Sequence, residues 1–155
     1  MTKTFKLLFL LTLCISAGVA SAYTPLKNIK VVDGDTIRAE AKGQEIKIRL
    51  VEIDAPEMNQ PFGLQSKNFL NRLLYKKNVT LVAQGEDPYG RVLGNIFSDE
   101  INVNLLMVKY GMAWVYEKYA KNSSLFKHQA QAQEEKLGLW KTKEPIAPWV
   151  WRRQN

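Results

Sequence analysis

The chain has 155 residues, of which 46% are hydrophobic and 24% are charged, so it is too short for two ordinary domains and too apolar to be intrinsically disordered. Lysine and arginine number 22 against 15 acidic residues, and the resulting net charge of +7 favours polyanionic partners such as nucleic acid or anionic lipid. The single cysteine, Cys14, excludes an internal disulfide framework and a zinc site built from several thiolates.

The first 22 residues have the pattern of a secretory signal peptide. Lys3 and Lys6 precede an apolar run over residues 7–15, and residues 20–22 have the small side chains that a signal peptidase accepts. The apolar run is shorter than the roughly 20 residues needed to cross a bilayer. We therefore expect cleavage after Ala22, export to the periplasm or the cell exterior, and no membrane association afterwards.

Five segments after the signal peptide have the composition or alternation of β-strands. The third segment changes parity after Leu50, because Ile46, Ile48 and Leu50 keep one period while Val51 and Ile53 keep the other. This change predicts a bulge near Leu50, and bulges are frequent beside active sites. We expect the five strands to follow one another as a meander; they span 26–32, 35–41, 46–53, 79–83 and 92–97.

Three helices are predicted between and after these strands. The first includes residues 69–74, where leucine and phenylalanine recur on one helix face. The second begins after a cap at Asn102 and runs to Tyr110. The third begins at a cap formed by Ser123 or Ser124 and ends at 137–138.

The C-terminal tail (141–155) is predicted to be non-helical because it contains Pro145 and Pro148. Its aromatic and basic side chains require either a groove in which to pack or a partner to contact, and packing against the rest of the domain is favoured. These side chains are Trp149, Trp151, Arg152 and Arg153.

Five short strands with helices at their ends predict an α+β fold. These elements suggest a five-stranded oligonucleotide-binding (OB-fold) β-barrel with three α-helices, although the pattern alone would equally allow other α+β arrangements. We therefore divide the chain into a signal peptide over 1–22, one domain over 23–140 and the C-terminal tail over 141–155.

Polar residues outside the predicted helices gather at 33–36, 49–57 and 87–91, each of which is also an ordinary turn or strand end. Asp35 and Asp54 both fall where strands give way to loops. Their hard oxygen atoms suit Ca²⁺ or Mg²⁺ rather than a soft metal. Together with one backbone carbonyl they fill about three of the roughly six to eight positions that Ca²⁺ takes, which leaves room for water and a phosphate oxygen.

Three more charged residues lie in the same segments. Glu57 is a carboxylate that can take a proton from water near the metal, and Arg49 and Arg91 can present positive charge to a phosphate under attack. The plainer alternative is a surface ion pair for each arginine and a solvent-exposed loop charge for Glu57.

The order and spacing of several short motifs resemble the staphylococcal nuclease (thermonuclease) family, over most of the chain from about Ile29 to Trp140. The motifs are D-G-D-T at 33–36, R-L-V-E-I-D-A-P-E at 49–57, D-P-Y-G-R at 87–91, N-V-N-L-L at 102–106, G-M-A-W-V at 111–115 and G-L-W at 138–140. The resemblance implies an OB-fold barrel with three helices and Ca²⁺-dependent hydrolysis of phosphodiester bonds in DNA and RNA.

The resemblance also assigns roles to individual residues. It makes Asp35 and Asp54 the carboxylate ligands of the metal and Ala55 a ligand through its backbone carbonyl. The best-known member of the family has threonine at the position of Ala55, so this chain lacks a hydroxyl group there.

The same resemblance makes Arg49, Glu57 and Arg91 the catalytic residues. Tyr116 and Tyr119 are candidates for binding the terminal phosphate of a nucleotide, although both could instead pack against the barrel.

Three functions remain as hypotheses. The first is an exported, monomeric Ca²⁺-dependent nuclease with little sequence preference, acting on DNA and RNA and favouring single-stranded or locally unpaired substrate. The second is a non-catalytic nucleic-acid-binding OB-fold module, which the five charged site residues disfavour. The third is a cationic binder of anionic polymers or lipids, which requires basic residues but none of the carboxylates.

Overall fold

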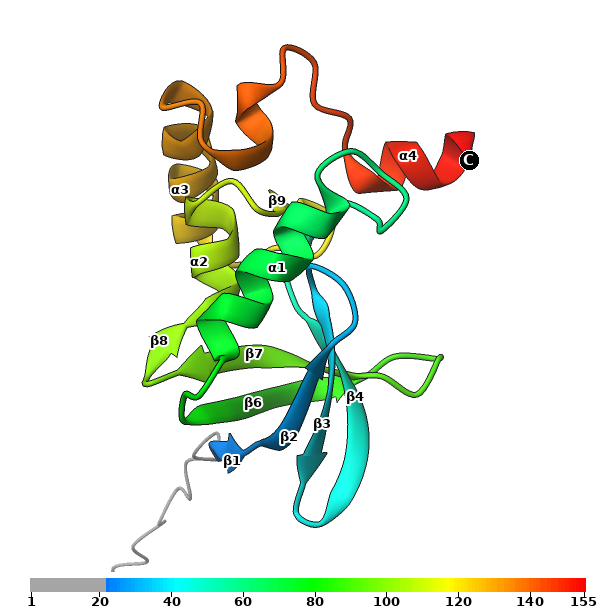
Figure 1. The fold of residues 1–155 in the computed structure, drawn as a ribbon, viewed down its shortest axis with the longest axis vertical. Helices are drawn as coiled ribbons and strands as arrows, with labels where there is room; N and C mark the ends of the chain where they lie inside the picture. Colours follow the sequence, from blue (N-terminus) through cyan, green and yellow to red (C-terminus); the bar gives the residue numbers. More distant parts are fainter. Residues whose placement is uncertain (1–21) are drawn as a thin grey trace, which may run out of the picture.

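The computed structural model describes residues 22–155, so the predicted signal peptide lies outside the described residues apart from Ala22. Most of the strands lie in the lower part of the molecule in Figure 1, and the helices lie above them. The strands are β1 (Thr24–Pro25), β2 (Lys27–Val31), β3 (Thr36–Ala41), β4 (Gln44–Leu50), β5 (Ile53–Asp54), β6 (Val79–Glu86), β7 (Val92–Ser98), β8 (Ile101–Asn102) and β9 (Trp114–Val115). The helices are α1 (Gly63–Leu74), α2 (Val103–Lys109), α3 (Ser123–Glu134), a short 3₁₀ helix η1 (Gly138–Lys141) and α4 (Pro148–Gln154).

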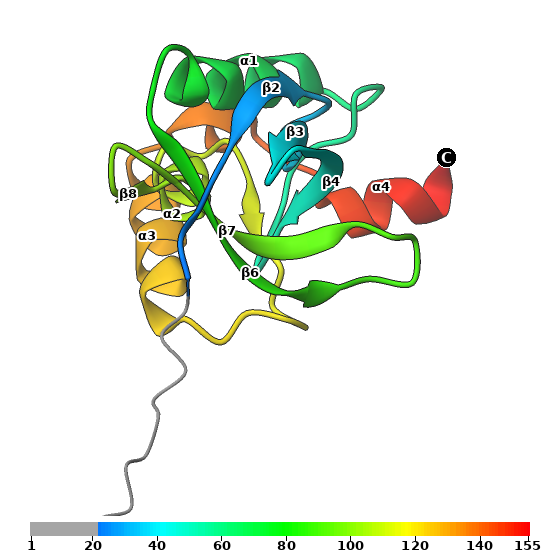
Figure 2. The same ribbon diagram turned by 90° about the horizontal axis from the view of Figure 1, so that it is seen from below.

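The main sheet closes on itself through its first strands. Its strand order is β1-β6-β7-β4-β3-β2, with β8 added beside β7. Only Leu26 separates β1 from β2, and its backbone N–H donates to the Val79 carbonyl at 2.9 Å. The segment 24–31 therefore supplies both end strands of the sheet, β1 and β2, which closes the sheet into a barrel. The predicted α+β fold built on an OB-fold barrel is confirmed, and in Figure 2 helix α1 lies above the crossing strands while α2 and α3 lie beside them.

One feature of the predicted strand order is wrong. In a meander the fourth predicted strand, which corresponds to β6, would pair with the third predicted strand, which corresponds to β4. In the structure β4 pairs instead with β7, in parallel. Strand β6 pairs with β7 on one side and with β1 on the other. This parallel pair brings the end of β4 beside the start of β7, so residues 44 positions apart meet at one end of the barrel.

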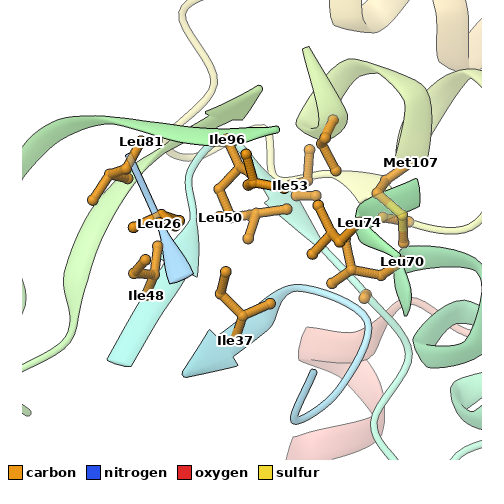
Figure 3. Packing of buried hydrophobic residues seen from close by; sticks show 14 of the residues in the cluster. Leu26, Ile37, Ile48, Leu50, Ile53, Leu70, Leu74, Leu81, Ile96 and Met107 are labelled. Atoms are coloured by element: carbon orange, nitrogen blue, oxygen red, sulfur yellow. The ribbon is translucent and has the colours of Figure 1, made fainter. Parts of the chain in front are cut away.

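The barrel interior is filled by the alternate residues that the sequence pattern predicts. Ile37 and Ala39 of β3 are buried, as are Ile48 and Leu50 of β4. Figure 3 shows Ile37, Ile48 and Leu50 in one apolar cluster with Leu70, Leu74 and Met107 of the helices. This continuous apolar core fixes the strand ends that carry the polar residues.

A turn replaces the bulge that was predicted near Leu50. Strand β4 ends at Leu50, Val51 and Glu52 form a turn in which Glu52 has a φ of 65°, and the short β5 begins at Ile53. The inserted turn places both Leu50 and Ile53 in the core. The predicted change of side-chain direction therefore occurs, by a different local geometry.

The three predicted helices correspond to α1, α2 and α3. The Asn102 side chain caps α2 by accepting from the Leu105 N–H, as predicted, and Gly111 follows the helix with a φ of 65°. The cap of α3 is Asn122, whose side chain accepts from the Ser124 N–H, so the predicted cap at Ser123 or Ser124 is wrong by one or two residues.

The prediction that the C-terminal tail is non-helical is wrong. Residues 148–154 form α4, and Pro148 occupies the first helical turn, where the missing N–H has no intrahelical acceptor in any case. Both views place α4 on the same side of the barrel as the loop between β6 and β7. Of the helices in residues 22–155, none is long and apolar enough to span a bilayer.

Candidate functional site

A single cleft of about 1170 Å³ at one end of the barrel contains every predicted site residue. The residues come from the turn before β3, the ends of β4 and β5, the loop before α1, the β6–β7 loop and the segment after β9. They are Asp35, Arg49, Asp54, Ala55, Glu57, Arg91, Tyr116 and Tyr119. Side chains that are separated by up to 84 positions in the sequence thus face one open space.

Asp35 and Asp54 converge on the guanidinium group of Arg49. Arg49 Nη2 lies 3.4 Å from Asp35 Oδ2 and 3.1 Å from Asp54 Oδ1. The Asp54 side chain is only 1% exposed and that of Asp35 only 9%. Arg49 also donates through Nη1 to the Leu50 and Ile53 carbonyls, so it ties the Val51–Glu52 turn to the two carboxylates.

Close backbone packing holds the two carboxylate-bearing segments together. Asp35 Oδ2 accepts a hydrogen bond of 2.7 Å from the Ala55 N–H. A Cβ on Gly34 would lie 2.6 Å from the Ala55 Cβ and would also collide with Ser66. Gly34 is therefore required for the close approach of the two segments. The interpretation of residues 33–36 as an ordinary turn did not predict this requirement.

Asn104 supports the same end of the barrel from within the core. Its side chain is 1% exposed and accepts from the Ile96 N–H at 3.1 Å. Its amide donates to the carbonyls of Val51 and Gly94. The N-V-N-L-L motif thus joins α2 to β7 and to the turn after β4, and no polar atom of this buried amide is left without a partner.

Glu57 lies in the loop between β5 and α1, with a side chain that is 36% exposed. Gln60 closes this loop, because its Oε1 accepts from the Glu57 N–H at 3.0 Å. At the start of α1, a Cβ on Gly63 would collide with the Glu57 carbonyl. The loop is therefore compact, and it presents a solvent-accessible carboxylate beside the Asp54 side chain.

Arg91 is held by its own loop. Arg91 Nε donates to Asp87 Oδ2 at 2.7 Å, and Asp87 Oδ1 accepts from the Arg91 N–H at 2.9 Å. The terminal nitrogens of Arg91 have no hydrogen-bond partner among residues 22–155. They are available to an anion, whereas the terminal nitrogens of Arg49 are engaged with protein acceptors.

Tyr116 and Tyr119 lie together where the chain leaves β9. Their rings meet edge to face with centroids 4.8 Å apart, and Tyr119 is 55% exposed. The Tyr116 N–H donates to the Glu52 carbonyl, so this segment is fastened to the turn after β4. Both tyrosines line the cleft rather than the barrel interior.

The carboxylates in the cleft are electrostatically strained. Burial raises the pKa of Asp54 above its ordinary value and the charge of Asp35 adds to the rise, while hydrogen bonds from Arg152 and the charge of Arg49 oppose it. Burial, and to a smaller extent the charge of Asp35, also raises the pKa of Asp33 to about 6. Asp33, which the sequence analysis did not assign to the site, lines the same cleft.

Arg152 of α4 is a further site residue that the sequence analysis missed. Its Nη2 lies 2.7 Å from Asp54 Oδ2, and its Nη1 lies 2.6 Å from Glu57 Oε1. The hydrogen bond to Asp54 raises the pKa of the Arg152 guanidinium, so the group stays charged. The only sequence signal was the unexplained pair of arginines in the C-terminal tail.

Comparison with known proteins shows the family of this chain. A family model described as "Staphylococcal nuclease homologue" matches residues 47–142, which is more than half of the chain. The chain belongs to the staphylococcal nuclease family. The match includes most of the cleft residues and η1, and it ends before α4.

Several relatives of this family member are similar over most of their length. A Haemophilus influenzae protein described as an uncharacterized endonuclease is 43% identical over 153 residues, which is 96% of this chain and 86% of that protein. A Shigella flexneri micrococcal nuclease is 35% identical over 138 residues, covering 82% of this chain and 79% of the nuclease. An Escherichia coli protein, also described as an uncharacterized endonuclease, is 42% identical over 128 residues, which cover 82% of this chain and 84% of that protein. Family membership and these relatives together support nuclease activity for this chain.

Proposed function

We propose that this protein is an exported Ca²⁺-dependent nuclease that hydrolyses phosphodiester bonds in DNA and RNA with little sequence preference. The observation that supports the proposal most directly is the convergence of Asp35, Arg49, Asp54, Glu57 and Arg91 on one open cleft. A phosphodiester is an anion that repels nucleophiles, so a site that hydrolyses it needs both positive charge and a positioned base. This set of side chains offers both.

The donors in the cleft suit a hard divalent cation. No group of three or more His, Cys, Asp or Glu side chains within residues 22–155 is arranged to hold a metal ion by itself. Asp35 and Asp54 nevertheless both approach one cation, Arg49 Nη2, and their burial favours added positive charge. Asp35 and Asp54 would hold Ca²⁺ with the backbone carbonyl of Ala55, and the remaining positions would be left to water and substrate.

When bound, Ca²⁺ neutralises charge on the phosphate and makes nearby water more acidic. Glu57 would then accept the proton of the water that attacks phosphorus, and the leaving oxygen would take a proton from solvent as its bond to phosphorus breaks. Arg91, with free terminal nitrogens, is placed to bind the phosphate oxygens as they gain charge. Arg49 keeps the carboxylates of Asp35 and Asp54 together and adds a second positive charge beside them.

Substrate binding in this proposal depends on the phosphate backbone and on stacking. Contacts to phosphate position a nucleic acid but carry no sequence information. Tyr119 offers an exposed aromatic ring, and both Tyr116 and Tyr119 line the cleft, which suits the exposed bases and end phosphates of single-stranded or unpaired substrate. The net charge is +7 for the full chain and +5 once the signal peptide with Lys3 and Lys6 is removed, and this positive charge favours association with either DNA or RNA.

The decisive experiment compares cleavage of single-stranded DNA by wild-type protein and by the Glu57→Gln variant, each with Ca²⁺ and with a chelator. Glu45→Gln is the matched control, because Glu45 is an exposed carboxylate on β4 that pairs only with Arg38 among the described residues. We expect cleavage by wild type and the control in Ca²⁺, and its loss with the chelator or with Glu57→Gln.

Two outcomes would contradict the proposal. Cleavage that survives both the chelator and the Glu57→Gln substitution would refute the mechanism. DNA binding without cleavage under any condition would instead favour a non-catalytic nucleic-acid-binding module.

A further inference from the structure

The guanidinium of Arg152 occupies the acidic side of the cleft. It donates to both oxygens of Asp54, through Nη1 at 3.1 Å and Nη2 at 2.7 Å, and to Glu57 Oε1 at 2.6 Å. One side chain of the C-terminal tail thus binds both a candidate metal ligand and the candidate base.

These bonds nearly saturate Asp54. A carboxylate oxygen has about two positions for hydrogen bonds or ligands. Asp54 Oδ1 already accepts from Arg49 Nη2 and Arg152 Nη1, and Oδ2 accepts from Arg152 Nη2. A metal ion could coordinate Asp54 Oδ1 only by displacing an arginine. An ion that coordinated Asp54 Oδ2 would lie beside a positively charged guanidinium.

Arg49 and Arg152 differ in how readily they can leave. Arg49 is 13% exposed and is also bonded to the Leu50 and Ile53 carbonyls, so it is part of the barrel end. The Arg152 side chain is 41% exposed and extends from a short terminal helix. Of the two cations on Asp54, Arg152 is therefore the one that can be displaced.

The position of Arg152 is built into the fold by contacts along α4 and the residues before it. The Trp149 ring stacks on Tyr116, with centroids 5.5 Å apart and planes inclined by 3°. Trp151 Nε1 donates to Asn59 Oδ1 at 3.2 Å, and Gln60 Nε2 donates to the Ile146 carbonyl at 2.7 Å. The helix is thereby docked on the loop that carries Glu57.

We propose that Arg152 is a built-in competitor of the metal ion, which holds Asp54 and Glu57 in a closed arrangement until Ca²⁺ displaces it. The inference depends on the proposed Ca²⁺-dependent function and adds a residue that sets the calcium affinity of the site. Displacing Arg152 frees a ligand for the ion and releases Glu57 Oε1 from the guanidinium that occupies it. Metal binding and activation of the base are thus coupled through one guanidinium.

The test is calorimetric titration of Ca²⁺ into the purified full chain and into its Arg152→Gln variant. Arg153→Gln is the matched control, since Arg153 is the next residue of α4, is exposed, and forms no ion pair within residues 22–155. It removes the same charge one position away. If the closed arrangement holds about 90% of the molecules, Arg152→Gln should bind Ca²⁺ about tenfold more tightly than wild type, and Arg153→Gln should match wild type.

The possible results separate this inference from the proposed function. Equal or weaker Ca²⁺ binding by Arg152→Gln, with cleavage still abolished by chelator, overturns the competition alone. A raised KM for DNA with unchanged Ca²⁺ affinity also overturns it and makes Arg152 a phosphate contact. If wild type and both variants bind no Ca²⁺ and cleavage ignores the chelator, the proposed function fails and the inference fails with it.

Discussion

Replacing Arg49 with alanine should destabilise the protein as well as inactivate it. The substitution leaves two carboxylates, Asp35 and Asp54, whose side chains are 9% and 1% exposed, without the cation between them. It also removes the donor to the carbonyls of Leu50 and Ile53. Removing one partner of a buried ion pair typically costs about 3–5 kcal/mol.

The structure places the expected loss at the lower end of that range. Arg152 remains hydrogen-bonded to both oxygens of Asp54 and continues to neutralise it. We therefore expect the free energy of unfolding to fall by about 3 kcal/mol at neutral pH without Ca²⁺. With a slope of about 1.5 kcal/mol per molar urea, the unfolding midpoint should fall by about 2 M.

Arg38→Ala is the matched control for this measurement. Arg38 pairs with Glu45 on the barrel surface, where both side chains are more than half exposed, and such pairs contribute only about 0–1 kcal/mol. Urea denaturation followed by circular dichroism compares the two variants directly. If Arg49→Ala loses no more stability than Arg38→Ala, then Arg49 does not hold the two carboxylates together as described.

Three further predictions concern neighbouring positions. Gly34→Ala should lower the free energy of unfolding by about 1–3 kcal/mol, because the new Cβ would overlap Ser66 and lie 2.6 Å from the Ala55 Cβ; an unchanged melting temperature would contradict this. Because the pKa of Asp33 rises from 3.8 to about 6 on folding, the folded state binds the proton of the Asp33 carboxyl group more tightly than the unfolded state does. The stabilisation that this proton provides is lost as pH rises through 6. Without Ca²⁺, the free energy of unfolding of Asp33→Asn should therefore match that of wild type near pH 3.5 and exceed it above pH 6 by at most about 3 kcal/mol. A difference in this free energy that is constant across pH would refute the pKa shift. Arg91→Ala should lower kcat/KM for DNA by at least ~100-fold with little change in urea midpoint, since among residues 22–155 the ion pair of Arg91 is confined to Asp87 of its own loop; a retained rate would exclude Arg91 as a phosphate ligand.

The site residues of the barrel could be located from sequence because each belongs to a short motif at a strand end. Asp35 precedes β3, Asp54 ends β5, and Arg91 directly precedes β7, and closing a small barrel brings such ends together. The roles of these residues as ligand, base or phosphate contact remain predictions.

The features that were missed depend on contacts between distant segments. The parallel pairing of β4 with β7 has no local signal, because each strand alone has the same composition in either arrangement. Pro148 indicated a break in the C-terminal tail, but at the start of a helix the same ring favours helical φ. The ion pair between Arg152 and Asp54 joins residues 98 positions apart, and nothing in the sequence beside either residue specifies it.

The segment 24–31 also affects how readily this protein aggregates. Strand β1 covers the free edge of β6, while β2 covers the edge of β3. Proteolytic trimming past Leu26 would bare the apolar β6 edge while leaving the β2 side intact. Unpaired strand edges are templates for intermolecular pairing, so a trimmed sample should aggregate on storage before it loses its helices.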